Sequence, residues 1–214
     1  MRLELDGYVN PADINSAMEL YGKHMFNNTR PLLVKIYALS NDGGSVGEFS
    51  GFLYSGSDDV VVTAGHTVGY NNSGKDRKFR ARYDDGFEED LVLLKCAPDN
   101  VPDIAIFRGS RRAPRTLIGM GWSTGDTVYA FGFTALYSDP GFSRGIVSSS
   151  TVGRVAINAH ADNGYSGGPV LNSRGQLVGI IKGSIDATTM QVGITPAVDL
   201  HTLLLQSGQT GLQC

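Results

Sequence analysis

The stretch Asn163-Gly164-Tyr165-Ser166-Gly167-Gly168-Pro169 places a serine between glycines at the start of an apolar segment. A serine hydroxyl is a weak nucleophile, so it needs a neighbouring base and N–H donors for the oxyanion that its attack creates. Glycines beside the serine let the backbone aim two amides, those of Gly164 and Ser166, at one spot. The two glycines after the serine leave space for a substrate, and Pro169 sets the chain into a strand. The stretch therefore predicts a reactive serine at the edge of a β-structure.

Two further patterns supply the groups that such a serine requires. Val60-Val61-Val62-Thr63-Ala64-Gly65-His66 is an apolar strand that runs into a small-residue turn carrying a histidine. Pro102-Asp103-Ile104-Ala105-Ile106-Phe107 puts an aspartate just ahead of a buried strand, where its charge needs a partner. An imidazole N–H would be that partner. The chain order His66, Asp103, Ser166 therefore predicts a base, an orienting acid and a nucleophile.

Each of these signals has a simpler structural interpretation when it is taken alone. The serine stretch could be a glycine-rich turn, and Asp103 could cap a turn, with Asp99 as a nearby competitor. His24 and His201 fall on the first and last predicted helices, where a surface position is the ordinary expectation. The coincidence of three patterns, each in a suitable context, favours the catalytic interpretation.

The charge balance argues against nucleic acid and membrane partners. The 214 residues are 41% hydrophobic and 18% charged, as in a soluble globular protein. A net charge of −3 provides no large positive field. The basic clusters Lys75–Arg80 and Arg108–Arg115 contain few aromatic residues, which favours a solvated surface over a nucleic-acid site. Neither kind of partner is therefore expected, and the oligomeric state is left open.

The N-terminal segment lacks the apolar core of a signal peptide, and no apolar run approaches the roughly 20 residues that span a bilayer. We therefore expect a soluble protein, either cytoplasmic or cut from a larger precursor or viral polyprotein. Neither a metal nor an organic cofactor is expected, because no His/Cys cluster has ligand spacing and no phosphate-binding loop occurs. The two cysteines, Cys96 and Cys214, are expected to be unlinked thiols, although a pairing stays open.

The remaining pattern predicts many short strands between two helices. A first helix is expected to begin at Pro11 with Asn10 as its cap, and to pack on the body through apolar residues at three- and four-residue spacing. A last helix is expected over Pro196–Gln206. The predicted strands are Leu32–Leu39, Glu48–Tyr54, Val60–Ala64, Lys78–Tyr83, Leu91–Cys96, Ile104–Arg108, Thr127–Phe133, Phe142–Ser149, Arg154–Ile157, Pro169–Asn172, Leu177–Ile181 and Met190–Thr195. Strands without intervening helices, in a chain with 28 glycines, indicate an antiparallel sandwich or a pair of barrels.

Several motifs resemble those of the trypsin/chymotrypsin-fold serine peptidases, and most closely those of the HtrA-type branch, without a PDZ domain. The resembling segments are Ser50–Ser55, Asp103–Ile106, Phe142–Ser148, Ser166–Asn172, Gly175–Ile180 and Val192–Pro196. The resemblance covers about Leu32 to Leu205. It implies an all-β fold of two antiparallel six-stranded barrels: a helical extension over residues 1–30, a first lobe over 31–112, and a second lobe with the C-terminal helix over 113–214.

The resemblance also implies a serine endopeptidase that acts on a protein or peptide substrate, with His66, Asp103 and Ser166 as its triad, an oxyanion hole of the Gly164 and Ser166 amides, and an acyl-enzyme intermediate. It places the S1 pocket, which receives the substrate side chain before the cut bond, at His160 and at Ile180, Ile181, Lys182 and Gly183. His160 and Lys182 could favour an acidic side chain there. The simpler alternative is that Lys182 points to solvent and His160 caps a loop.

Two departures and two rival interpretations remain. Gly65 precedes the histidine where the HtrA branch has Ala or Asn, and Tyr165 stands where digestive enzymes have an aspartate that pairs with a new N-terminus. We therefore expect no activation of that kind. An α/β-hydrolase elbow would need a helix after the serine, whereas Pro169 leads into a strand. The other rival is a catalytically inactive module with the same fold, used for binding or structure.

Overall fold

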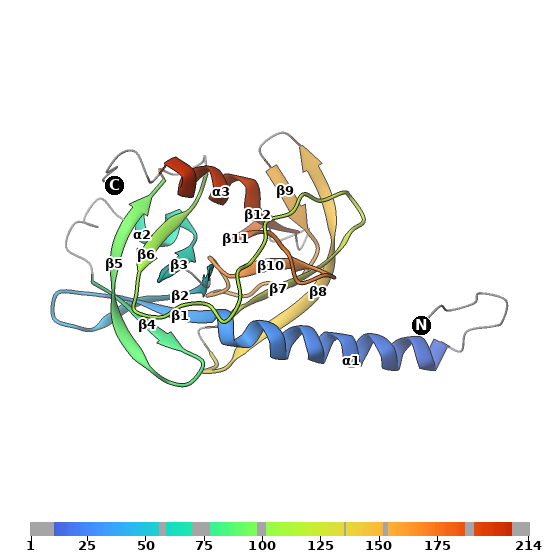
Figure 1. Cartoon of the computed structure of the whole chain (residues 1–214), viewed down its shortest axis with the longest axis horizontal. Helices are drawn as coiled ribbons and strands as arrows, with labels where there is room; N and C mark the ends of the chain where they lie inside the picture. Colours follow the sequence, from blue (N-terminus) through green and yellow to red (C-terminus); the bar gives the residue numbers. More distant parts are fainter. Residues whose placement is uncertain are drawn as a thin grey trace.

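The strands form two closed barrels that lie side by side (Figure 1). The structure is a computed structural model, and it describes residues 11–55, 59–69, 78–97, 102–134, 136–151, 154–186 and 191–206. The first barrel has the strand order β1-β2-β3-β6-β5-β4 and the second has β10-β11-β12-β9-β8-β7. All neighbouring strands are antiparallel. The expected pair of six-stranded antiparallel barrels is confirmed.

Most strand bounds lie close to those predicted from the sequence, but β11 continues to Asp186 and does not end at Ile181, because its added residues pair with β12. In the first barrel they are β1 Leu33–Leu39, β2 Ser45–Leu53, β3 Val60–Thr63, β4 Lys78–Tyr83, β5 Glu88–Cys96 and β6 Ala105–Arg108. In the second they are β7 Thr127–Phe133, β8 Pro140–Thr151, β9 Arg154–Ile157, β10 Pro169–Asn172, β11 Leu177–Asp186 and β12 Gln191–Pro196. Strand β4 shows why such segments form strands, since Phe79, Ala81 and Tyr83 alternate with more exposed residues.

Strand β7 is apolar on both of its faces because each face meets a different core. The side chains of Val128 and Ala130 pack in the apolar core of the second barrel. Those of Tyr129, Phe131 and Phe133 pack in the other cluster of buried apolar side chains, which contains the core of the first barrel. Successive side chains of a strand point to opposite faces, so one strand serves both cores. The two barrels are therefore joined by a continuous apolar interface.

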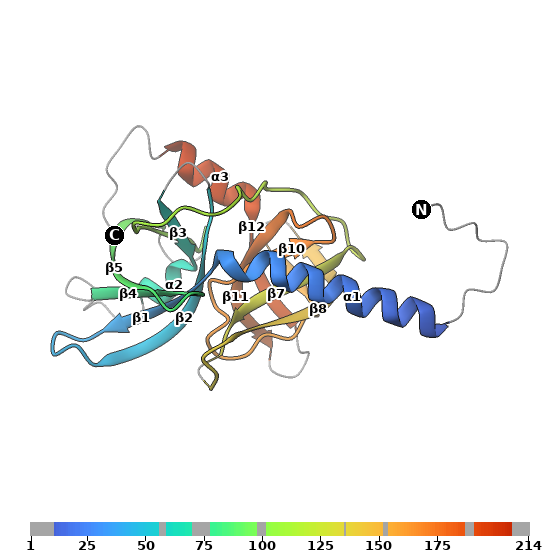
Figure 2. The same ribbon diagram turned by 60° about the horizontal axis from the view of Figure 1, so that its bottom comes forward.

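Two longer helices lie outside the barrels. Helix α1 (Pro11–Thr29), followed by a 3₁₀ turn (Arg30–Leu32), runs beside β7 and β8, and helix α3 (Ala197–Gln206) follows β12 (Figures 1 and 2). Helix α1 contacts the second barrel through the ring pairs Tyr21–Tyr129 and Phe26–Phe142, with centroids 6.0 and 5.4 Å apart. Ile14, nearer its start, is 45% exposed, so packing on the body involves chiefly the later turns. The expected cap, Asn10, lies outside the described residues.

A third, short helix was not predicted. Helix α2 (Gly65–Gly69) follows β3 and carries His66, where the sequence suggested only a small-residue turn. The Asp103 carboxylate accepts a hydrogen bond from the His66 backbone N–H, and the Thr67 hydroxyl donates to the Ala64 carbonyl at 2.6 Å. Because Asp103 is distant in the chain, no local pattern reveals this helix start.

Several arginines in the described part of the basic clusters are paired with carboxylates. Arg80 pairs with Asp90, Arg111 with Asp85 and Arg112 with Asp59. Lys75 and Arg77 lie outside the described residues, as does Cys214 of the cysteine pair. In the part of the chain that the structure covers, no helix combines the length and the apolar character that a membrane crossing requires.

Candidate active site

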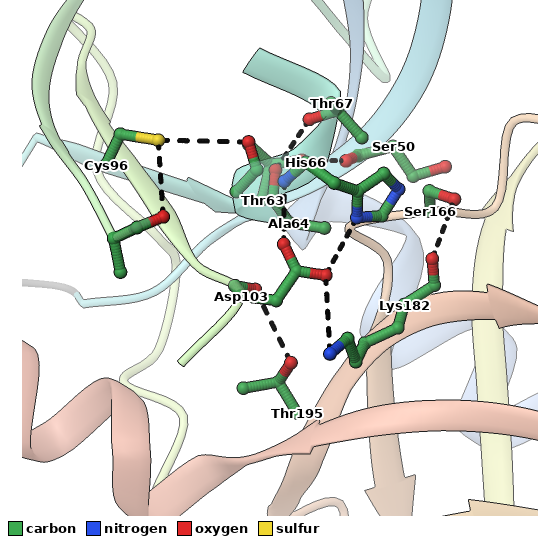
Figure 3. Close-up of polar contacts among 12 residues, drawn as sticks. Ser50, Thr63, Ala64, His66, Thr67, Cys96, Asp103, Ser166, Lys182 and Thr195 are labelled. Atoms are coloured by element: carbon green, nitrogen blue, oxygen red, sulfur yellow. Dashed lines mark hydrogen bonds and ion pairs between the residues drawn. The ribbon is translucent and has the colours of Figure 1, made fainter. Parts of the chain in front are cut away.

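Two hydrogen bonds hold together His66 and Asp103, which lie at the same end of the paired neighbouring strands β3 and β6. Strand β3 leads into α2 and presents His66, and the segment just ahead of β6 presents Asp103. The imidazole Nδ1 lies 2.8 Å from Asp103 Oδ2, and the His66 backbone N–H donates to Oδ1 at 2.6 Å (Figure 3). One carboxylate thus fixes both the ring and the backbone of the histidine.

The Asp103 carboxylate is buried while the imidazole is partly accessible. The exposed fraction of the Asp103 side chain is 3%, and that of His66 is 27%. Burial by itself would raise the pKa of the Asp103 carboxyl, but the hydrogen bonds and charge of His66, with a smaller contribution from the Lys182 ammonium, hold that pKa below its usual value. The carboxylate is therefore ionised at neutral pH and orients the Nδ1 edge of the ring.

Ser166 approaches from the second barrel, on the loop between β9 and β10. Its side chain lies beside the edge of the imidazole that faces away from Asp103 (Figure 3). The Ser166 hydroxyl donates a hydrogen bond to the Lys182 carbonyl at 3.3 Å. Proton transfer to the imidazole would need the hydroxyl to rotate towards the ring, a change that substrate-free sites commonly require.

The backbone of the serine loop leaves two amides without a carbonyl partner. Among the described residues, the N–H groups of Tyr165, Gly167 and Gly168 donate to carbonyl oxygens, whereas those of Gly164 and Ser166 donate to none. Gly164 has a φ of +102°, a conformation that favours glycine. The two amides expected to bind an oxyanion are thus available as donors.

The two glycines after Ser166 contact the protein itself. The sequence argument reserved their space for substrate, but a Cβ on Gly167 would lie 2.0 Å from the Thr63 hydroxyl and 2.2 Å from the Ser50 carbonyl oxygen. A Cβ on Gly168 would lie 2.0 Å from the Phe131 carbonyl oxygen. These glycines let the serine loop press against the backbone of both barrels.

Gly167→Ala is expected to prevent stable folding, because the methyl group meets fixed backbone and Gly167 also has a φ of +88°. Gly43→Ala is the matched control, since Gly43 has a φ of +86° and nothing within 4 Å of a Cβ. The control should lose only the roughly 1–2 kcal/mol of left-handed strain, against more than about 4 kcal/mol for Gly167→Ala. Urea unfolding of both variants measures the difference. Equal losses would refute the steric argument.

The residues predicted to form the S1 pocket fall in different environments. Gly183 adjoins the serine, because a Cβ built there would lie 3.7 Å from Ser166 Oγ. The side chains of Ile180 and Ile181 are fully buried, one in each core cluster. His160 is 70% exposed and its Nε2 lies 2.9 Å from Asp162 Oδ1. Lys182 turns its ammonium to within 4.0 Å of Asp103 Oδ2. The side chains of His160 and Lys182 therefore both face carboxylates of the protein.

Ser50 is the residue at this site that sequence reasoning did not single out. It lies on β2, and its backbone N–H donates to the Ser166 carbonyl at 2.9 Å. The only local signal is a serine on a stretch that is otherwise apolar or glycine, from Phe49 to Leu53. Among the described residues, no group of three or more His, Cys, Asp or Glu side chains forms a candidate metal site.

Comparison with known proteins gives consistent matches. The family described as "Trypsin-like peptidase domain" matches residues 49–180. Two curated proteins described as "Serine protease Do-like HtrA", from Lactococcus lactis subsp. cremoris (strain MG1363) and subsp. lactis (strain IL1403), are each 28% identical to the chain, over 165 and 156 residues. These alignments cover 70% and 66% of this chain but 40% and 38% of the relatives. The chain thus spans about two fifths of their length.

Among solved structures, the crystal structure of the serine endoprotease from Yersinia pestis superposes with a TM-score of 0.76. Its sequence is 20% identical, and the superposition covers 89% of this chain and 67% of that one. At this identity the match concerns the fold, which it supports over nearly the whole chain.

Proposed function

The chain belongs to the trypsin-like peptidase domain family, and from this premise we propose that it is a serine endopeptidase that cleaves peptide bonds through an acyl-enzyme intermediate. The observation that carries the proposal is the contact between the buried Asp103 carboxylate and the His66 imidazole, with Ser166 beside the ring's other edge. A single imidazole can then accept the proton of a hydroxyl on one side, while a carboxylate on the other side stabilises the positive charge that the ring gains.

In the proposed reaction His66 removes the proton of Ser166 as the serine oxygen attacks the carbonyl carbon of the substrate. The amides of Gly164 and Ser166 stabilise the oxyanion that forms. His66 then gives the proton to the leaving amine, and the C–N bond breaks to leave an acyl ester on Ser166. Water, deprotonated by His66, attacks this ester, and the second oxyanion collapses as His66 returns the proton to the Ser166 oxygen, which releases the acid and restores the free serine.

Substrate side chains are proposed to enter beside Gly183, with His160 and the backbone of Lys182 bordering the S1 pocket and the buried Ile180 and Ile181 supporting it from behind. Because His160 and Lys182 each face a carboxylate of the protein, their attraction for an acidic substrate side chain is reduced. We propose that neither side chain sets a preference for acidic residues, although Lys182 faces Asp103 and does not point to solvent as the simpler alternative expected.

Labelling with a fluorophosphonate tests the proposed function directly. This reagent loses fluoride to an activated serine and stays bonded to its oxygen, so mass spectrometry should locate the label on Ser166 in the folded protein. Urea-unfolded protein is the control, because the activated geometry is then lost. A folded protein that takes up no label, or takes it up elsewhere, would favour the rival view of an inactive binding module.

A further inference from the structure

Ser50 belongs to the first barrel, yet its hydrogen bonds reach the serine loop of the second. Its hydroxyl donates to the Gly164 carbonyl at 2.7 Å and accepts the backbone N–H of Phe133 at 2.8 Å. Its own backbone N–H donates to the Ser166 carbonyl at 2.9 Å. The residue has no exposed surface, so water does not compete for these bonds.

The position of Ser50 is itself fixed by a neighbouring strand. The Thr63 hydroxyl, on β3, donates to the Ser50 carbonyl oxygen at 2.7 Å in a buried environment. With one donor and one acceptor role in use, the Ser50 hydroxyl is directed rather than free to rotate. Ser50 therefore acts as a rigid anchor, held by β3 and β7 and facing the loop.

The loop needs such an anchor because glycine occupies the position that carries the first of the two amides. Gly164 lacks a Cβ, so its peptides rotate more freely than those of other residues. Ser50 donates hydrogen bonds to the carbonyls of Gly164 and Ser166, which are the two ends of the segment Gly164-Tyr165-Ser166. Between them the Tyr165 ring is buried, with Gly132 and Gly141 of the paired strands β7 and β8 leaving room for it.

We propose that Ser50 is a positioning residue for the reaction, whose hydroxyl bridges β7 to the Gly164 carbonyl and thereby keeps the Gly164 and Ser166 amides converged on the oxyanion. This role rests on the proposed function, since it concerns the same two amides. Ser50 touches neither the substrate nor the imidazole in this arrangement. Its effect is exerted through the backbone of the loop.

Ser50→Ala removes the bridge and leaves the Gly164 carbonyl and the Phe133 N–H without their partner. A misplacement of about 1 Å in a reacting group costs around 100-fold in rate, and loss of one oxyanion donor costs about 10²–10³-fold. We expect kcat to fall by about 10–100-fold with KM changed by less than about twofold. A merely structural serine would lower the melting temperature without this selective loss of kcat.

A tetrahedral inhibitor gives a second readout. A peptide aldehyde forms an adduct whose oxygen occupies the oxyanion position, so its affinity should fall in Ser50→Ala by the same factor as kcat. The corresponding peptide alcohol, which has no carbonyl group and so forms neither an adduct nor an oxyanion, should bind the variant and the wild type equally. Ser148→Ala is the matched control, because the Ser148 hydroxyl donates to the Ala156 carbonyl at 3.1 Å within the β8–β9 pair.

Four outcomes are decisive. Parallel losses of kcat and aldehyde affinity, absent from Ser148→Ala, support the role of Ser50. An unchanged kcat in folded Ser50→Ala, or an equal loss in Ser148→Ala, overturns that role alone. If Ser50→Ala does not fold, Ser50→Cys replaces it, because the thiol is a small side chain with a weaker donor. This variant should show a smaller loss of kcat at constant KM. An unchanged kcat in Ser50→Cys would overturn the role of Ser50. A wild type that neither cleaves nor is labelled overturns the proposed function itself.

Discussion

Ser166→Ala is expected to lower kcat/KM by about 10⁴-fold or more, because the oxygen that would form the acyl-enzyme is removed while the oxyanion donors and binding surface stay in place. The side chain is small and the loop is fixed by backbone bonds such as Gly167 N–H to the Ile181 carbonyl at 2.8 Å, so the variant should fold like the wild type. Residual rather than zero activity is the expected result.

A proteome-derived peptide library, digested by the wild type and by Ser166→Ala, measures this effect. Cleavages present only with the wild type report the activity, and the residues that precede those cuts describe the S1 preference. Thermal unfolding of both proteins shows that the comparison is between folded states. Equal cleavage by the two proteins would mean another nucleophile or a contaminating protease.

Asp103→Asn is expected to produce a loss of similar size, about 10⁴-fold in kcat. The amide keeps the size of the side chain but has no charge to stabilise the imidazolium, and it can present an N–H where the carboxylate accepts one. The pKa of the Asp103 carboxyl lies below its usual value, so the wild type carries the charge at neutral pH.

The lowered pKa of the Asp103 carboxyl also predicts how the stability of the protein depends on pH. A carboxyl whose folded pKa lies below its unfolded value contributes stability above about pH 4 and loses it as the pH falls through the folded value. The wild type should therefore lose stability relative to Asp103→Asn on acidification below pH 4, which urea unfolding at pH 7 and pH 3 would show.

Asp90→Asn is the control for the effect of Asp103→Asn on kcat. Asp90 is exposed and pairs with Arg80 at 2.9 Å, so kcat of this variant should stay within about twofold of the wild type. A similar kcat in Asp103→Asn and the wild type would refute the orienting role.

Strand positions were predictable because alternation of apolar and polar residues is a local property. The bounds of β4, β7, β9 and β10 match the prediction, whereas β5 begins at Glu88 rather than Leu91. Glu88, Glu89 and Asp90 are polar, and they join the strand by pairing with Arg82, Ala81 and Arg80 of β4. A polar segment becomes a strand when its partner strand supplies the hydrogen bonds and opposite charges, and this is not visible in the segment itself.

The three groups that we propose to be catalytic were singled out from the sequence for a different reason. Ser166, His66 and Asp103 each stand next to a strongly apolar strand, where a polar or reactive side chain requires an explanation. Ser50 begins one of the resembling segments, but its role was not predictable because its partners, Gly164 and Phe133, come from the other barrel. Lys182 was assigned to substrate binding, but its ammonium faces Asp103.

By itself, the sequence determined the class of fold, the positions of the strands and the identity of the groups able to do the chemistry, because these follow from periodicity and from residue type. Only the tertiary structure decided which groups meet: Asp103 with the ring and backbone of His66, and Ser50 with the loop of Ser166. Both contacts join residues far apart in the chain: the first forms when β3 and β6 pair as the first barrel closes, and the second crosses the interface between the two barrels. Contact across such an interface depends on the packing of both barrels at once, which no local stretch of residues encodes.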